Sequence, residues 1–201
     1  MKRGTIILLV VLGVILFLAF SVFGWYTRTY NSLVTLDEGV KQAWSQVQNQ
    51  YQRRLDLIPN LVEVVKGYAT HESQVFTQVA EARASVGKLQ VTPELLNNPQ
   101  TFQRFQEAQG QLSSALSRLL AVAENYPQLK ANEGFLQLQS QLEGTENRIA
   151  VERRRFNEIV QDYNTKIRLF PTSIIAGMMG FAQKQYFEAE AGAEHAPKVK
   201  F

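Results

Sequence analysis

The sequence has 201 residues, no cysteine and a net charge of only +3, from 21 lysines and arginines against 18 acidic residues. The lack of cysteine excludes disulfides, thiol nucleophiles and thiolate metal sites. The small positive charge allows attraction to anionic lipid but is weak evidence for nucleic-acid binding, so we expect no nucleic-acid partner.

The chain begins with an apolar run from Gly4 to Thr27 that contains no charged residue and no proline. About 20 such residues cross a bilayer core as a helix, which satisfies every backbone polar group internally. We predict a transmembrane anchor over residues 1–27, followed by a bend or short break near residues 26–30. The residues expected to contact lipid are Ile6, Leu8, Leu12, Leu16, Phe20, Trp25 and Tyr26.

A cleaved signal peptide is the alternative, because Lys2 and Arg3 precede the apolar run. The run is longer than the roughly 7–15 residues usual for such a peptide, and no small-x-small cleavage site follows it. Lys2 and Arg3, against Arg28 after the run, favour an N-terminus inside the cell. We therefore predict a single-pass membrane protein whose body, in a bacterial cell with the span in the inner membrane, would be periplasmic or extracytoplasmic.

From Tyr30 onward, apolar residues recur every three or four positions, which predicts a first body helix. Trp44 beside this seam is interpreted as an apolar filler with its N–H at the edge. At residues 53–60, Pro59 interrupts the pattern and favours a tight hairpin between two helices. One continuous kinked helix is the alternative.

Helix start and stop signals later in the chain predict three further helices. The second is expected over residues 58–86, which would give a helix of about 28 residues ended by Gly87. A connector over residues 88–98, with a turn started at Thr92-Pro93, leads to the third. The third helix is expected to begin at Asn98-Pro99 and to end at Tyr126-Pro127. The fourth helix is expected to begin at Asn132 and to end at Phe170-Pro171.

No strand-like alternation occurs, so the predicted fold is all-α: a transmembrane helix followed by a long antiparallel up-and-down four-helix bundle over residues 28–170. Its seam spacing is that of coiled-coil packing.

Motifs for chemistry are lacking. His71 and His195 do not stand in Glu-x-x-His, and no phosphate-binding loop, serine elbow or zinc spacing occurs. We therefore predict no catalytic, cofactor-binding or metal-binding residue. The run Arg153–Arg155 is interpreted as a solvated helix face, and a buried Glu152 would need a partner such as Arg53 or Arg54.

Residues 171–201 are predicted to form an apolar membrane-proximal segment, outside the regular helices, and a loose polar tail from Glu188. The apolar residues either cap the bundle core or form a contact surface for membrane or partner. An up-and-down bundle returns its fourth helix to the end where the first began, which brings this segment beside the anchor. The candidate contact residues are Ile174, Ile175, Met178, Met179 and Phe181.

Several stretches resemble the bacterial LemA family. They run over residues 30–72, 116–164 and 170–181, together with the ending APKVKF, and the segments DLIPN and AENYPQLKAN are specific. Gly39 and Gly134 depart from the helix formers expected there, at about 1 kcal/mol each in a helix interior. The resemblance implies a single-pass membrane protein with a four-helix body and no attached enzymatic activity or cofactor.

Two classes of function remain. The first is a non-enzymatic structural or interaction protein of the cell envelope, anchored in the lipid bilayer, that self-associates as a homo-oligomer or serves as an adaptor for membrane-protein partners. The alternative is a lipid- or small-ligand-binding bundle, or a weak enzyme, that works at the membrane surface.

Overall fold

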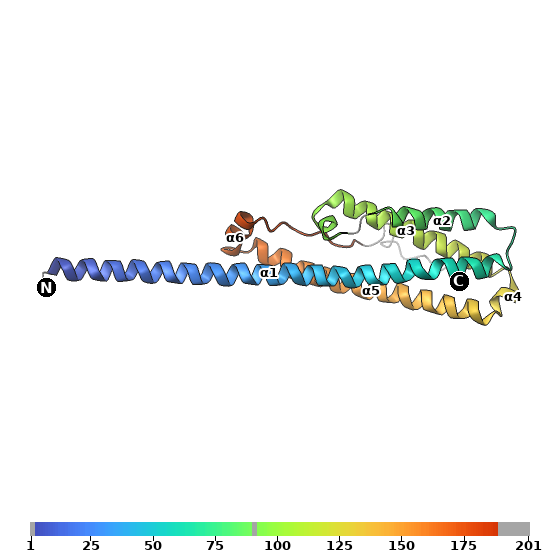
Figure 1. The fold of residues 1–201 in the computed structure, drawn as a ribbon, viewed down its shortest axis with the longest axis horizontal. Helices are drawn as coiled ribbons and strands as arrows, with labels where there is room; N and C mark the ends of the chain where they lie inside the picture. Colours follow the sequence, from blue (N-terminus) through green and yellow to red (C-terminus); the bar gives the residue numbers. More distant parts are fainter. Residues whose placement is uncertain (1–2, 90–91, 189–201) are drawn as a thin grey trace, which may run out of the picture.

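A computed structural model describes residues 3–89 and 92–188, and all regular structure in this part of the chain is helical. The predicted all-α class is confirmed. The molecule is a long rod in which α1, Arg3–Lys66, has 64 residues (Figure 1). The usual helical rise makes α1 about 96 Å long. Its first part stands alone, and the other helices gather along the remainder (Figure 1). The break expected near residues 26–30 is absent, since α1 continues through them.

The hairpin predicted at residues 53–60 is wrong, and the continuous helix is what the structure shows. Pro59 lies on the exposed side of α1, while its neighbours Ile58 and Leu61 are buried. The missing N–H of Pro59 leaves the carbonyl of Leu55 without its helical donor. Arg83 on the next helix donates from Nε to that carbonyl at 3.4 Å. Buried contacts on one face and an outside donor on the other therefore keep the helix intact.

The first turn of the chain comes later, at residues 67–72, so the helix predicted over residues 58–86 is divided. Tyr68 and Ala69 both donate to the carbonyl of Val65, which closes the end of α1. The next helix, α2, spans Ser73–Gly87 and has only 15 residues, about half the predicted length. Its end at Gly87 agrees with the prediction.

The predicted start signals in the second half of the chain are confirmed. A short 3₁₀ helix, η1, covers Pro93–Asn97, and α3 covers Pro99–Ala123. The Asn98 side chain accepts from the backbone N–H of Thr101 at 3.1 Å. After the four-residue α4, Pro127–Lys130, comes α5, Glu133–Arg168, with 36 residues. Asn132 caps α5 by accepting from the N–H of Phe135 at 2.9 Å, and Gly134 lies in this first turn rather than in the helix interior.

The segment expected to lie outside regular helices forms one: α6 spans Thr172–Met179. Gly180 then adopts a left-handed conformation with φ of 76°, which ends α6 and turns the chain back. Residues 181–188 continue without regular structure along the body. The rest of the predicted polar tail, and His195 within it, lies outside the described residues, as does Lys2.

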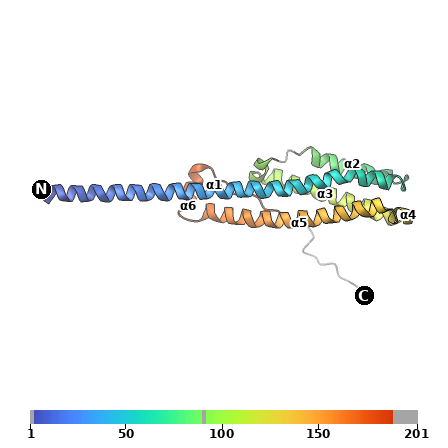
Figure 2. The same cartoon turned by 60° about the horizontal axis from the view of Figure 1, so that its bottom comes forward.

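The body is organised by two antiparallel helix pairs, α1 with α5 and α2 with α3 (Figures 1 and 2). Two apolar clusters fill it. The distal cluster, farther from the N-terminus, draws on α1, α2, α3 and α5 and contains Ile58, Leu61, Val65, Val79, Leu112, Leu119 and Leu142. The proximal cluster lies toward the N-terminus and contains Leu33, Val40, Trp44, Phe102, Phe105, Phe156, Val160, Ile175 and Phe187. The four-helix bundle and the division into residues 1–27, 28–170 and 171–201 stay predictions.

Candidate interaction site at the proximal end of the body

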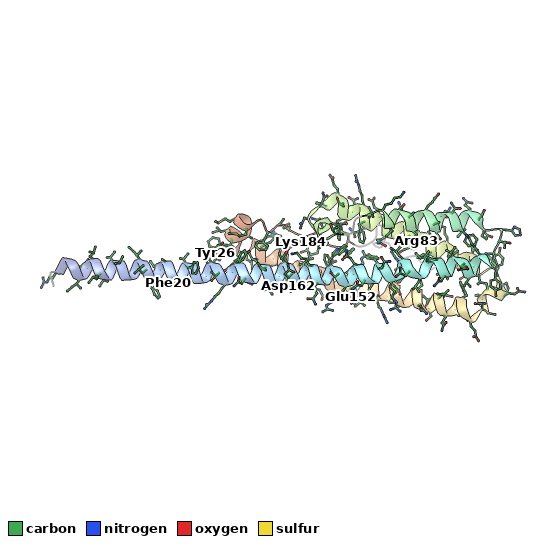
Figure 3. All side chains as sticks on the ribbon, in the orientation of Figure 1. Phe20, Tyr26, Arg83, Glu152, Asp162 and Lys184 are labelled. Carbon is green, nitrogen blue, oxygen red and sulfur yellow. The ribbon has the colours of Figure 1, made fainter. Side chains whose placement is uncertain are left out.

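Of the seven residues predicted to contact lipid, all but Tyr26 lie on the part of α1 that no other element covers. Ile6, Leu8, Leu12, Leu16, Phe20 and Trp25 are all exposed. Figure 3 shows Phe20 projecting from this free part of the helix. Within the described residues, α1 is the one helix long and apolar enough to cross a membrane, judged by length and composition.

Tyr26, at the end of the apolar run, joins the span to the body. It is half-buried and its ring stacks on that of Tyr30, with centroids 6.5 Å apart. Its hydroxyl donates to Sδ of Met179 at 3.8 Å. The Tyr30 ring meets Phe181 edge-on at 6.2 Å. The predicted return of the C-terminal apolar segment to a place beside the anchor is therefore confirmed.

Two kinds of apolar residue occur on α6, and they match the two alternatives left open. Ile175 and Ala176 are buried in the proximal cluster, so this face caps the core. Ile174, Met178 and Met179 are exposed, and Met178 reaches 72%. Just before α6, Leu169 is also exposed and Phe170 reaches 81%. We call these five exposed residues, Leu169, Phe170, Ile174, Met178 and Met179, the proximal patch.

Beyond α6, side chains of α5 hold the extended segment by its main chain. Asn164 donates to the carbonyl of Lys184 and accepts from its N–H, both at 2.9 Å. Asn157 makes the same pair of hydrogen bonds with Phe187, at 2.8 and 2.9 Å. Asn157 and Asn164 are seven residues apart on α5, a rise of about 10.5 Å. Their partners Phe187 and Lys184 are three residues apart, which spans roughly 10 Å in an extended chain. The two asparagines are therefore in register with the segment.

Phe187 anchors this segment in the core. Its ring stacks on Trp44 at 6.0 Å, lies 5.1 Å from Phe102 and 5.5 Å from Phe156, and has Arg153 over its outer face at 4.7 Å. Sequence reasoning missed Phe187, because no local periodicity marks a single buried ring in an extended segment. It also misplaced Trp44, which is fully buried, with no partner for its Nε1 in the described part of the chain.

A charged group fixes the same segment to α1. Asp37 pairs with Lys184 and with Lys41, each at 3.0 Å. Burial alone would raise the pKa of Asp37, but hydrogen bonds from the two lysines outweigh it and hold that pKa below its usual value. Beside this pair, burial and the Asp37 charge raise the pKa of Tyr163 to about 12. The Tyr163 hydroxyl donates to the carbonyl of Ala182 at 3.0 Å.

Arg54 forms a polar layer between the two clusters. Only 2% exposed, it donates from Nη1 to Glu146 and Ser113 at 2.9 Å, and from Nη2 to Gln109. The buried charge of this region is therefore Arg54 with partner Glu146, whereas Glu152 is half-exposed.

The three consecutive arginines of α5, residues 153–155, differ in their exposure to solvent. Arg154 and Arg155 are exposed, as predicted for a solvated face, and Arg153 is half-buried against the bound C-terminal segment.

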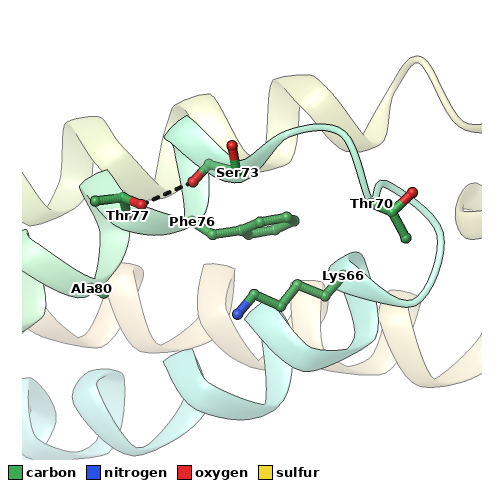
Figure 4. A pocket seen from close by; sticks show the side chains of 6 residues that line it. All are labelled: Lys66, Thr70, Ser73, Phe76, Thr77 and Ala80. Carbon is green, nitrogen blue, oxygen red and sulfur yellow. Dashed lines mark hydrogen bonds between the residues drawn. The ribbon is translucent and has the colours of Figure 1, made fainter.

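Other depressions lie on the surface of the described part of the chain. The one in Figure 4, about 470 Å³ at the α1–α2 turn, is lined by Lys66, Thr70, Ser73, Phe76, Thr77 and Ala80. The Lys66 ammonium lies 5.4 Å from the Phe76 ring centroid, and the Thr77 hydroxyl donates to the Ser73 backbone carbonyl at 3.0 Å (Figure 4). His71 is exposed nearby. Among the described residues, no three His, Asp or Glu side chains gather as metal ligands do.

Comparison with known proteins gives these features a family. The LemA family matches residues 43–201. Magnetosome proteins MamQ 1 and MamQ 2 of Paramagnetospirillum magneticum are each 26% identical over 208 residues, covering 96% of this chain and 76% of theirs. Magnetosome protein MamQ of Magnetospirillum gryphiswaldense is 27% identical over 209 residues with the same coverage. Protein LemA of Metamycoplasma hominis is 24% identical over 164 residues, covering 82% of this chain and 71% of its own. The family match extends over more than half of the sequence, and the chain belongs to the LemA family.

Proposed function

We propose that this protein is a membrane-anchored, non-enzymatic structural or interaction protein of the bacterial cell envelope. The observation that carries the proposal is the continuity of α1, which runs without interruption from the exposed apolar span into the core of the body. Such a helix holds the body at a fixed distance from the bilayer. Relatives named for the magnetosome support a role at a cellular structure rather than in metabolism.

A helical body joined rigidly to an apolar span is best suited to self-association or to binding other membrane proteins. The apolar side chains of the span are exposed along its length and offer a surface that neighbouring membrane proteins can reach. In-cell crosslinking of the tagged full-length chain, followed by native mass spectrometry in detergent, tests this activity. We expect a reproducible oligomer or a recovered membrane-protein partner. A chain that stays strictly monomeric, with no partner recovered, would contradict the proposal.

The proposed orientation places the N-terminus inside the cell and the body outside. Because the sequence has no cysteine, the single substitution Ser45→Cys at an exposed position of α1 gives one unambiguous label. A membrane-impermeant maleimide should label this variant in intact cells whose inner membrane is sealed. Labelling only after the inner membrane is permeabilised would reverse the orientation.

Lipid or small-ligand binding is the second candidate, favoured by a depression of about 530 Å³ between α1 and α5 near the span. Leu36 and Leu169 supply apolar lining, and Thr35, Thr165 and Lys166 supply hydrogen-bond donors suited to a lipid headgroup. Asp162 also lines the depression, which favours a headgroup that carries a positive charge as well as a phosphate. A lipid that stays with the protein through detergent purification, and is lost in Lys166→Glu, would support this function. Retention of the same lipid by that variant would place it elsewhere.

A further inference from the structure

The outer face of α6 has the wrong composition for contact with water. The helix TSIIAGMM contains no charged residue, and its exposed positions are Ile174, Gly177, Met178 and Met179. A surface helix of a soluble body places polar residues opposite its buried face, whereas a helix that is apolar on both faces belongs in a core or in lipid. Phe170, 81% exposed one residue before the turn into α6, extends the same surface.

The height of this surface relative to the span follows from its contacts with α1. Met179 touches Tyr26, and Phe181 meets Tyr30 four residues further along the helix. If the apolar run fills a hydrocarbon core of about 30 Å, these positions lie within about 6 Å beyond its edge. That is the interfacial layer, whose depth suits a helix lying flat with its apolar face inward. Figures 1 and 2 both show α6 at the end of the body from which the free part of α1 emerges.

The charges nearest this level are basic, and the first acidic residues, Asp37 and Asp162, come about 10 Å farther along α1 and α5 than Tyr30 and Leu169. The stretch of α1 from Gly4 to Leu36 contains Arg28 alone, and residues 163–183 contain Lys166 and Arg168 alone. Arg28 and Arg168 are exposed. No acidic residue occurs in either stretch, so nothing there repels the phosphates of anionic lipids.

We infer that α6 and the preceding Leu169-Phe170 corner insert into the interfacial layer of the bilayer beside the span. The occupant of the proximal patch is thus lipid, and the chain has a second, non-spanning membrane contact. The inference rests on the proposed function in one respect, because α1 must cross the bilayer to bring α6 to this level. Contact at two points would fix the tilt of the body, which a single helical tether leaves free.

Tryptophan quenching by brominated acyl chains tests the inference on the full-length chain in lipid vesicles. Trp25 is replaced by phenylalanine, and Ile174→Trp or Met178→Trp is added at exposed positions that accept a larger ring. Leu136→Trp, exposed near the far end of α5, is the matched control. Trp44 is buried about 27 Å beyond Tyr26 along α1 and serves as an internal reference in every variant.

We expect the indole at position 174 or 178 to be quenched about as strongly as Trp25 in the unmodified chain, and at least about fivefold more than the one at position 136. Quenching of Trp25 without quenching at 174 and 178 would overturn the inference and leave the proposed function standing. That pattern would mean that a protein neighbour or water covers the proximal patch. If Trp25 also escapes quenching, the span is outside the bilayer and both proposals fail.

A second measurement separates insertion from a chance apolar contact. Two chains are compared in vesicles with and without phosphatidylglycerol. The first carries Trp25→Phe and Met178→Trp, and the second carries Arg28→Gln and Arg168→Gln in addition. Anionic lipid should increase the quenching of the first and have little effect on the second, because these two exposed guanidiniums face the headgroups. An increase of equal size in both would contradict the role given to the basic residues.

Discussion

Replacing Arg54 by methionine is expected to destabilise the body by about 1–3 kcal/mol, because Gln109, only 6% exposed, loses the donor for its carbonyl oxygen. Glu146 adds at most about 1 kcal/mol, since its side chain is 39% exposed and can turn to water. The Nε of Arg54 has no partner among the described residues, so its removal relieves one unsatisfied donor. Methionine keeps most of the packing of the arginine stem.

Urea unfolding of the full-length chain in detergent, followed by far-UV circular dichroism, measures this change. Arg53→Met is the matched control, because Arg53 is exposed on the same turn and its loss should stay within about 0.5 kcal/mol. Adding Gln109→Leu to Arg54→Met should recover most of the lost stability, since apolar residues can replace a buried polar group and its partner together. A double variant less stable than Arg54→Met would refute the reasoning, because the loss would then come from packing.

Three further changes test other parts of the body. Pro59→Ala should raise the free energy of unfolding by up to about 3 kcal/mol, because an N–H at this position can bond to the Leu55 carbonyl. Asn164→Ala should speed hydrogen exchange at the Lys184 amide, which loses its acceptor, and leave α2 unchanged. Because the pKa of Tyr163 is raised to about 12, folding favours its neutral phenol. The free energy of unfolding that this adds is present below pH 10 and is lost as the pH rises through about 12. The stability of Tyr163→Phe should therefore lack this decline between pH 10 and 12.

Each of these outcomes has a counterpart that would contradict it. Unchanged stability in Pro59→Ala would mean that the Arg83 hydrogen bond already compensates for the proline. Equal acceleration of exchange in α2 would mean that Asn164→Ala loosens the whole body rather than the bound segment. For Tyr163, the absorbance of the tyrosines is titrated at high pH in the unmodified chain and in Tyr163→Phe. The tyrosine missing from the variant should be one that ionises near pH 12, and a missing tyrosine that ionises near pH 10 would contradict the raised pKa.

Local signals predicted the parts of the fold that local physics decides. Asn98 and Asn132 are caps whose hydrogen bonds lie within one turn of the helix they begin, so three or four residues were enough to locate them. The apolar span is equally local, because only length and composition matter. The position of α6 beside Tyr26 could also be predicted, since it follows from the direction of the last long helix.

Contacts between distant residues decided what the sequence could not show. Pro59 reads as a break, but its exposed position and the donor from Arg83 are properties of the assembled body. The burial of Phe187 depends on a pocket made by Trp44, Phe102 and Phe156, three residues on three different helices. In the proximal patch, the sequence named Ile174, Met178 and Met179. Only the structure separates them from the buried Ile175 and adds Leu169 and Phe170.

The two apolar clusters differ in how much of the chain must be present before each can close. Members of the distal cluster all lie between Ile58 and Leu142, whereas the proximal cluster joins Leu33 to Phe187. Shorter loops close at a smaller entropic cost, so the distal half is expected to assemble first, and Trp44 stays uncovered until Phe187 has been synthesised and docked. Folding would thus proceed from the far tip toward the apolar run of α1. The half next to the apolar run, completed last, is the half that can open while the tip remains folded.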